Sequence, residues 1–161
     1  MADNTSCPFC NIDQARILYA DKHCFAVRDG FPVSRGHTLI IPRRHIGSFF
    51  DTTATEKSAL LRALEQTKTQ LAREYSPDAW DIGINDGPAA GQTVSHLHIH
   101  LIPKYQGDMA DPRGGVRWVL PDKTAYRGPG YARESLQFRN IFMNFPDNPI
   151  KGGLFFIIQS G

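Results

Sequence analysis

The sequence contains no long hydrophobic run, little net charge and no recognisable export signal. No uninterrupted apolar segment approaches the roughly 20 residues that a helix needs to cross a bilayer, so we expect no membrane span. The 18 basic and 16 acidic residues leave a net charge of +2, which argues against nucleic acid as a partner. The first residues have neither a basic start nor an apolar stretch, so we expect a cytoplasmic protein.

The chain has the composition of an ordinary globular domain. Of its 161 residues, 41% are hydrophobic and 21% are charged, which excludes an intrinsically disordered protein. It contains no internal repeat and no low-complexity segment, and its length is that of a single domain. We expect this domain at residues 1–126 and assign no role to the C-terminal extension, residues 127–161.

Two kinds of hydrophobic pattern predict one long helix and several short strands. Apolar residues recur at helical spacing from about Thr55 to Tyr75, and Ser76-Pro77 can end that helix. Strand-forming segments separated by turn residues predict strands at residues 16–20, 24–29, 37–41, 80–85 and 96–102. The amphipathic pattern of the helix indicates that it lies across a sheet.

Three histidines alternate with aliphatic residues along the last of these segments. Successive side chains of a strand point to opposite faces, so His96, His98 and His100 are expected to share one face. That face can be a solvated surface, a metal site built from the row alone, or a centre for catalysis on phosphate. A neutral imidazole is a competent nucleophile near neutral pH, and residues 91–93 offer amide and hydroxyl donors for a phosphate. This combination favours catalysis on phosphate.

The segment from Gly91 to Tyr105 resembles the signature of the histidine-triad (HIT) superfamily, in which three histidines alternate with apolar residues. The stretch from Asn85 to Val94 is most similar to the fragile-histidine-triad branch, which hydrolyses dinucleoside polyphosphates. Asp29 and the stretch Gly36–Pro42 also match, so the resemblance covers about residues 7–105. It implies an α+β fold with a five-stranded antiparallel sheet and one long helix packed on it. It also implies the homodimer that is common in this family.

The same resemblance implies roles for individual residues. His98 would be the nucleophile that forms a covalent nucleotidyl-histidine, His100 would hydrogen-bond the α-phosphate, and His37 would orient the row from a neighbouring strand. Asp29 would accept hydrogen bonds from the ribose hydroxyls, although an aspartate before Gly30 can instead form a turn. The phosphate-binding positions would be Asn85, Gly91, Gln92 and Thr93.

The expected function is nucleotide hydrolysis or nucleotidyl transfer through His98, on a dinucleoside polyphosphate or a related phosphate ester or amidate. Two alternatives stay open. A dinucleoside polyphosphate phosphorylase would pass the same covalent intermediate to phosphate, and a nucleotide-binding regulatory protein would keep the site with little turnover. The intact nucleophile weighs against the regulatory protein, because a protein that only binds nucleotides needs none.

The N-terminal Cys7-Pro8-Phe9-Cys10 has the spacing with which two thiolates chelate one metal ion. A redox pair would need a strand-to-helix junction, which this N-terminus does not predict, whereas two reduced thiols packed in the core are a simpler alternative. A tetrahedral zinc needs two further ligands, for which His45 and His96 are the candidates. Related galactose-1-phosphate uridylyltransferases and some HIT proteins hold zinc with such a set, so the resemblance implies a structural zinc.

Overall fold

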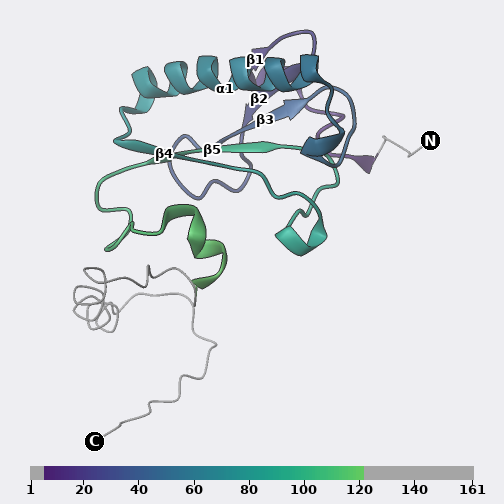
Figure 1. Ribbon diagram of the computed structural model, residues 1–161. Coiled ribbons are helices and arrows are strands. Elements are labelled where there is room, and N and C mark those ends of the chain that lie inside the picture. The colour runs from purple at the N-terminus through teal and green to yellow at the C-terminus, as the bar shows by residue number, and fades with distance from the viewer. Residues whose placement is uncertain (1–5, 122–161) are drawn as a thin grey trace, which may run out of the picture. The chain divides into compact units, whose positions relative to one another are not determined.

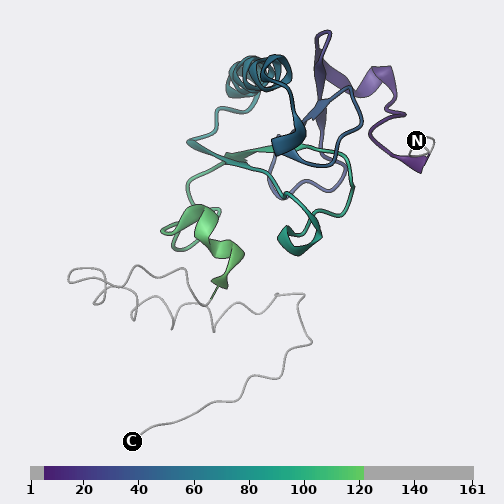
Figure 2. The ribbon, with the colours of Figure 1, turned by 45° about the vertical axis from the view of Figure 1, so that its right-hand side comes forward.

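The fold is that of a computed structural model of the chain, shown in Figures 1 and 2, which describes residues 6–121. Contacts divide the chain into two units, Met1–Met109 and Ala110–Gly161, and each is described by itself. The extension expected at residues 127–161 lies outside the described residues, so a domain boundary at residue 126 stays a prediction. Among the described helices, none is long and apolar enough to cross a membrane.

The first unit contains a five-stranded sheet in which every neighbouring pair of strands is antiparallel, as expected. The strand order is β1-β2-β3-β5-β4, which places the C-terminal strand of the sheet second from one edge. Opposite His100 of β5 lie Leu39 of β3 on one side and Gly83 of β4 on the other. The strands are β1 (Ile17–Ala20), β2 (Cys24–Arg28), β3 (Thr38–Pro42), β4 (Ala79–Gly83) and β5 (Ile99–Lys104).

The long helix α1 (Ala54–Tyr75) lies along one face of this sheet, as Figures 1 and 2 show. It begins with a reciprocal capping box, in which Thr53 accepts from the Glu56 amide and the Glu56 carboxylate accepts from the Thr53 amide. It ends at Ser76, which takes the left-handed conformation with φ 50°. Helix and strands therefore agree with the expected α+β arrangement.

The strand β5, on which all three histidines were expected, begins later than the sequence predicts. We expected residues 96–102, but β5 is Ile99–Lys104, so His96 and His98 precede it. The cause is a contact distant in sequence: the Leu97 amide donates to the Ile46 carbonyl at 2.6 Å. The chain therefore runs beside the loop after β3 before it enters the sheet.

The sheet has an apolar core on each face. Between sheet and helix, α1 packs against a cluster that includes Ile40, Leu60 and Leu97, all fully buried. Burying one such side chain stabilises the fold by about 1.5–3 kcal/mol. The second cluster consists of Phe25, Val27, Leu39 and Ile41, with Phe9, Ile12 and Ile17 packed against it. Leu39 lies opposite His100, so this second cluster and that histidine occupy the same face of the sheet.

Four short 3-10 helices complete the described chain. In the first unit these are η2 (Gln14–Arg16), η3 (Phe49–Asp51) and η4 (Pro88–Ala90). The described part of the second unit contains η5 (Gly115–Val119), where the Trp118 indole N–H donates to the Arg113 carbonyl at 3.2 Å. The loops that carry η3 and η4 are hydrogen-bonded to each other, and the η4 loop leads into the residues that precede β5.

Candidate active site and metal centre

His37, His98 and His100 form one group of histidines, and His96 faces a different cluster, that of the N-terminal cysteines. The rings of His98 and His100 lie 5.0 Å apart, and those of His37 and His100 lie 5.2 Å apart, centroid to centroid. His96 instead directs its ring towards the N-terminal cysteines. The structure thus brings together the three histidines for which catalytic roles are expected and separates His96 from them.

The tautomer of His98 follows from one hydrogen bond. Its Nδ1 lies 2.8 Å from the backbone carbonyl oxygen of His96, and a carbonyl can only accept. Nδ1 therefore carries the proton, and Nε2 keeps its lone pair. The side chain is buried, and the edge of the Phe9 ring packs against it with centroids 5.2 Å apart. The nitrogen with the lone pair is the one that can attack an electrophile.

His37 and His100 form a hydrogen-bonded pair. The Val33 amide donates to His37 Nδ1 at 3.3 Å, which leaves the proton of a neutral His37 on Nε2. His37 Nε2 then donates to His100 Nδ1 at 3.0 Å, so His100 carries its own proton on Nε2. An Nε2–H group on His100 is a donor of the kind that a phosphate oxygen accepts.

Burial keeps this pair uncharged at neutral pH. Desolvation lowers the pKa of His37, although the Asp29 carboxylate opposes it. Desolvation, together with the neighbouring His98 and His37, lowers the pKa of His100 to about 4. Both rings are therefore neutral hydrogen-bonding groups near pH 7 rather than cations.

The two carboxylate oxygens of Asp29 have different surroundings. The sequence leaves two roles open for this residue, a turn and a ribose acceptor. Oδ1 accepts the Phe31 amide at 2.8 Å, which is the turn expected of an aspartate before glycine. Oδ2 lies 3.4 Å from His37 Nδ1 and 4.0 Å from His100 Nδ1. One oxygen thus holds the loop while the other faces the histidines.

Asn85 and Gly91 lie next to each other in the loop between β4 and β5. Gly91 has φ 85°, a conformation that favours glycine, and a Cβ on it would lie 3.8 Å from Asn85 Nδ2. Its amide, like that of Gln92, donates within the loop. Thr93 is exposed, and among the described residues its amide and hydroxyl have no protein partner. Asn85 and Thr93 are therefore predicted phosphate-binding residues whose side-chain donors are available for an anion.

The Gln92 side chain is hydrogen-bonded at both ends of its amide. Oε1 accepts the Gly87 amide and Nε2 donates to the Gly47 carbonyl, both at 2.8 Å, and contact of Gln92 with a phosphate stays a prediction. A second fastening comes from Asp86, whose Oδ2 accepts the Phe49 amide at 2.8 Å. These contacts hold the 86–92 loop against the loop that follows β3. The sequence does not indicate the contacts with Gly47 and Phe49, because these residues lie 45 and 37 positions from Gln92 and Asp86.

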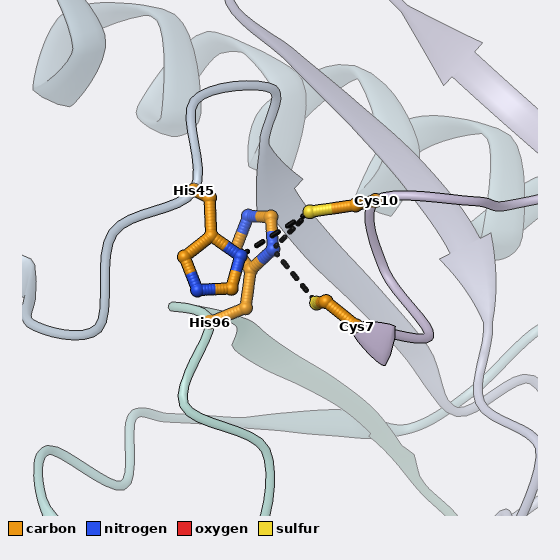
Figure 3. Close-up of side chains that lie close together, drawn as sticks. All are labelled: Cys7, Cys10, His45 and His96. Carbon is orange, nitrogen blue, oxygen red and sulfur yellow. Dashed lines mark hydrogen bonds between the residues drawn. The ribbon is translucent and has the colours of Figure 1, made fainter. Parts of the chain in front are cut away.

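The four predicted metal ligands converge, as Figure 3 shows. Sγ of Cys7 and Cys10 lie 3.4 and 3.6 Å from His96 Nδ1. Cys10 Sγ lies 3.2 Å from His45 Nδ1. Zinc bonds of about 2.3 Å to sulfur and about 2.0 Å to nitrogen, at tetrahedral angles, separate such atoms by about 3.5 Å. The donor set and its spacing are compatible with a structural zinc.

One further observation supports the fit of this cluster to a metal. His96 Nε2 lies 2.8 Å from the Pro42 carbonyl oxygen and must donate to it, so Nδ1 turns its lone pair towards the thiols. Burial, with a smaller contribution from Cys7, raises the pKa of the Cys10 thiol. A cation bound between the thiols would reverse that shift, because it stabilises the thiolate. His96 therefore supplies its ring to this cluster and its carbonyl to His98.

The apolar cluster beside His100 is the part of the site that the sequence analysis missed. Phe25 and Val27 of β2, with Leu39 and Ile41 of β3, form an apolar area, and Phe9 and Ile12 pack against it. The signal was available, because these strand residues alternate. Alternation alone does not distinguish this face from the one that α1 covers.

Comparisons with known proteins agree with this geometry. The HIT domain model matches residues 12–107. An uncharacterized HIT-like protein of Mycoplasma genitalium is 38% identical over 112 residues, or 66% of this chain and 79% of that protein. The bifunctional bis(5'-adenosyl)-triphosphatase/adenylylsulfatase FHIT of Arabidopsis thaliana is 36% identical over 97 residues, or 60% of this chain and 54% of that protein.

A solved structure of a similar protein contains zinc. The crystal structure of a zinc-bound histidine triad family protein from Mycobacterium smegmatis is 35% identical, with a TM-score of 0.60, over 68% of this chain and 82% of that one. The sheet, the helix, the grouped histidines and the family match all lead to one assignment. The chain belongs to the HIT family.

Proposed function

We propose that this protein is a nucleotide hydrolase that cleaves a dinucleoside polyphosphate through a covalent nucleotidyl intermediate on His98. The observation that carries the proposal is the hydrogen bond from His98 Nδ1 to the His96 carbonyl, which leaves Nε2 free to attack. The similarity to a bis(5'-adenosyl)-triphosphatase supports the choice of substrate. Related nucleoside phosphate esters, amidates and mixed anhydrides, the last of which include adenylyl sulfate, are further substrates to test.

The proposed reaction has two displacements at the α-phosphorus. In the first, His98 Nε2 forms a bond to phosphorus while the bond to the bridging oxygen breaks, and the leaving phosphate takes that electron pair. In the second, water attacks, the phosphorus–nitrogen bond breaks and its electron pair returns to Nε2, while a water proton passes to solvent. His98 Nδ1–H stays bonded to the His96 carbonyl, which stabilises the positive imidazole of the intermediate.

The neighbouring groups fit the rest of a nucleotide. His100 Nε2–H would donate to an α-phosphate oxygen, and Asn85 and Thr93 supply further donors from the adjoining loop. The nucleobase is proposed to lie beside the buried apolar cluster formed by Phe25, Val27, Leu39 and Ile41, which shares the face of His100. The Asp29 oxygen that faces the histidines is the acceptor proposed for the ribose hydroxyls.

The assignment is tested by incubating the protein with diadenosine triphosphate in water enriched in oxygen-18, with and without added phosphate. A hydrolase forms AMP and ADP, and the label enters AMP. A phosphorylase makes unlabelled ADP in place of AMP, and only when phosphate is present. Absence of turnover with this substrate, with diadenosine tetraphosphate and with adenylyl sulfate would favour the regulatory alternative.

We also propose a homodimer that forms along β4. This strand is an edge of the sheet, so one row of its backbone groups is available to pair, and Ile82 is 53% exposed on it. We expect Ile82→Lys to shift the protein towards monomer in light scattering coupled to gel filtration. Leu61→Lys is a suitable control, because Leu61 occupies an exposed position of α1. Ile17→Lys is not, because Ile17 packs against a core cluster. A monomeric wild-type protein would contradict the dimer.

We propose in addition that Cys7, Cys10, His45 and His96 hold one structural zinc. Four protein ligands leave no open coordination position, so this ion would not activate water. It would instead join the N-terminal segment, the loop after β3 and the residue that precedes β5. Its contribution to catalysis would be indirect, through the position of the His96 carbonyl.

The role of Asp29 is tested by Asp29→Asn, because asparagine still offers an oxygen to the Phe31 amide and so keeps the turn. The variant removes the negative charge from the acceptor that faces the site. We expect affinity for AMP to fall about tenfold, the loss typical of one charge-assisted hydrogen bond. Affinity for 2',3'-dideoxy-AMP should change much less in the same titration calorimetry. Equal losses for both ligands would leave Asp29 with the turn alone.

A further inference from the structure

We propose that Asp29, His37 and His100 form a second metal site, which takes an exchangeable divalent first-row transition-metal ion such as Zn²⁺. Asp29 directly follows β2, His37 directly precedes β3, and His100 lies in β5. All their ligand atoms lie within 4.8 Å of one another. The cluster shares no residue with the Cys7–Cys10 centre.

The spacing of the donors is close to that of a tetrahedral ion. His37 Nε2 and His100 Nδ1 lie 3.0 Å apart, and two nitrogens bound to one zinc at about 2.0 Å lie about 3.3 Å apart. Asp29 Oδ2 lies 4.0 Å from His100 Nδ1 and is the third donor of the cluster. The hydrogen bond between the two rings already requires one lone pair, on His100 Nδ1. A cation would replace the proton on His37 Nε2. That proton moves to His37 Nδ1, which then gives up the Val33 amide and has the Asp29 carboxylate 3.4 Å away as an acceptor.

The type of ligand and the exposure of the cluster define which ions it takes. Two imidazole nitrogens and one carboxylate oxygen suit zinc, cobalt, nickel and copper, but not magnesium or calcium, which prefer oxygen. His37 is buried, whereas His100 and Asp29 keep 21% and 14% of their side-chain surface exposed. Three ligands leave at least one open position. Together these features predict weaker, faster-exchanging binding than at the four-ligand cysteine centre.

The consequence for the site is a switch from hydrogen bonding to coordination. An ion on His37 Nε2 and His100 Nδ1 removes the hydrogen bond that joins the rings, and it engages the Asp29 oxygen proposed for ribose. The ion therefore competes with the arrangement that binds a nucleotide. Since metal binding requires no nucleotide, its test stands apart from that of the hydrolase proposal.

The experiment is a titration of the protein, with zinc already in the cysteine centre, by Co²⁺. Visible d–d absorption reports cobalt bound to nitrogen and oxygen. We expect one saturable equivalent in the wild type, and at least a tenfold weaker affinity in Asp29→Asn and in His100→Gln. Both variants change partly exposed side chains, so circular dichroism should show them folded. The matched control is His23→Gln, at a histidine outside both clusters, which should bind as the wild type does.

Three results would overturn the proposal. One is the absence of saturable Co²⁺ binding to the wild type. Another is unchanged affinity in both Asp29→Asn and His100→Gln, which would locate the ion elsewhere. The third is absorption by thiolate-to-cobalt charge transfer, which would show that Co²⁺ had entered the Cys7–Cys10 centre instead.

Discussion

His98→Ala is expected to reduce turnover of diadenosine triphosphate by on the order of 10³-fold or more, because the variant lacks the atom that forms the covalent intermediate. Binding of AMP should stay measurable. The apolar cluster under the base, the Asp29 oxygen and the loop donors Asn85 and Thr93 do not depend on the His98 ring. The measurement is steady-state kinetics together with titration calorimetry on the same preparation.

The controls separate lost chemistry from lost structure. His98 is buried and packs against Phe9, so its removal leaves a gap that costs some stability. A melting curve shows whether the variant is folded at the assay temperature, and His23→Ala controls for loss of a histidine outside the site. Activity of His98→Ala within tenfold of the wild type would rule out its role as nucleophile.

Loss of the cysteine centre is the other large effect that we expect. Replacing Cys7 and Cys10 by serine should abolish zinc binding and lower Tm by more than about 10 °C, because losing several kcal/mol shifts Tm by at least that much in a domain of this size. Metal analysis of protein without a histidine tag should find about one zinc per chain. Cys24→Ala is the matched control for metal content, since Cys24 lies outside the cluster.

The order of the two losses distinguishes a structural ion from a catalytic one. During chelation, the fall in Tm should come first, and activity at low temperature should decline as the structure loosens. The opposite order, with activity lost at unchanged Tm, would contradict a purely structural zinc. A metal-free protein of full stability, with two freely titrating thiols, would support packed cysteines instead.

The parts of the fold that could be predicted from the sequence are those governed by local periodicity. The stripe along α1 and the alternation of Leu97, Ile99 and Leu101 indicate buried faces directly, and all three of the latter are buried. The start of β5 could not be predicted this way. It depends on the contact between Leu97 and Ile46, and nothing in the local pattern reports a partner so far along the chain.

The candidate site divides along the same line. Cysteine and histidine are chemically distinctive, and together with the family resemblance they allowed Cys7, Cys10, His45 and His96 to be predicted as a candidate ligand set; the four side chains lie close together. Glutamine is not distinctive. The hydrogen bond from the Gln92 side chain to the Gly47 carbonyl could not be predicted, because Gly47 lies 45 residues earlier in the chain. The hydrogen bond between His98 and the His96 carbonyl could not be predicted either, because every residue has a backbone carbonyl.

The central claim is that a nucleotide becomes attached to His98, and trapping the intermediate tests it most directly. Labelled diadenosine triphosphate is mixed with enzyme, quenched in alkali to preserve the acid-labile phosphorus–nitrogen bond, and digested for mass spectrometry. We expect one adenylyl group on the peptide that contains His98 and β5, attached at His98 and absent from His98→Ala. An adenylyl group on His100, or turnover with no labelled enzyme at any time point, would contradict it.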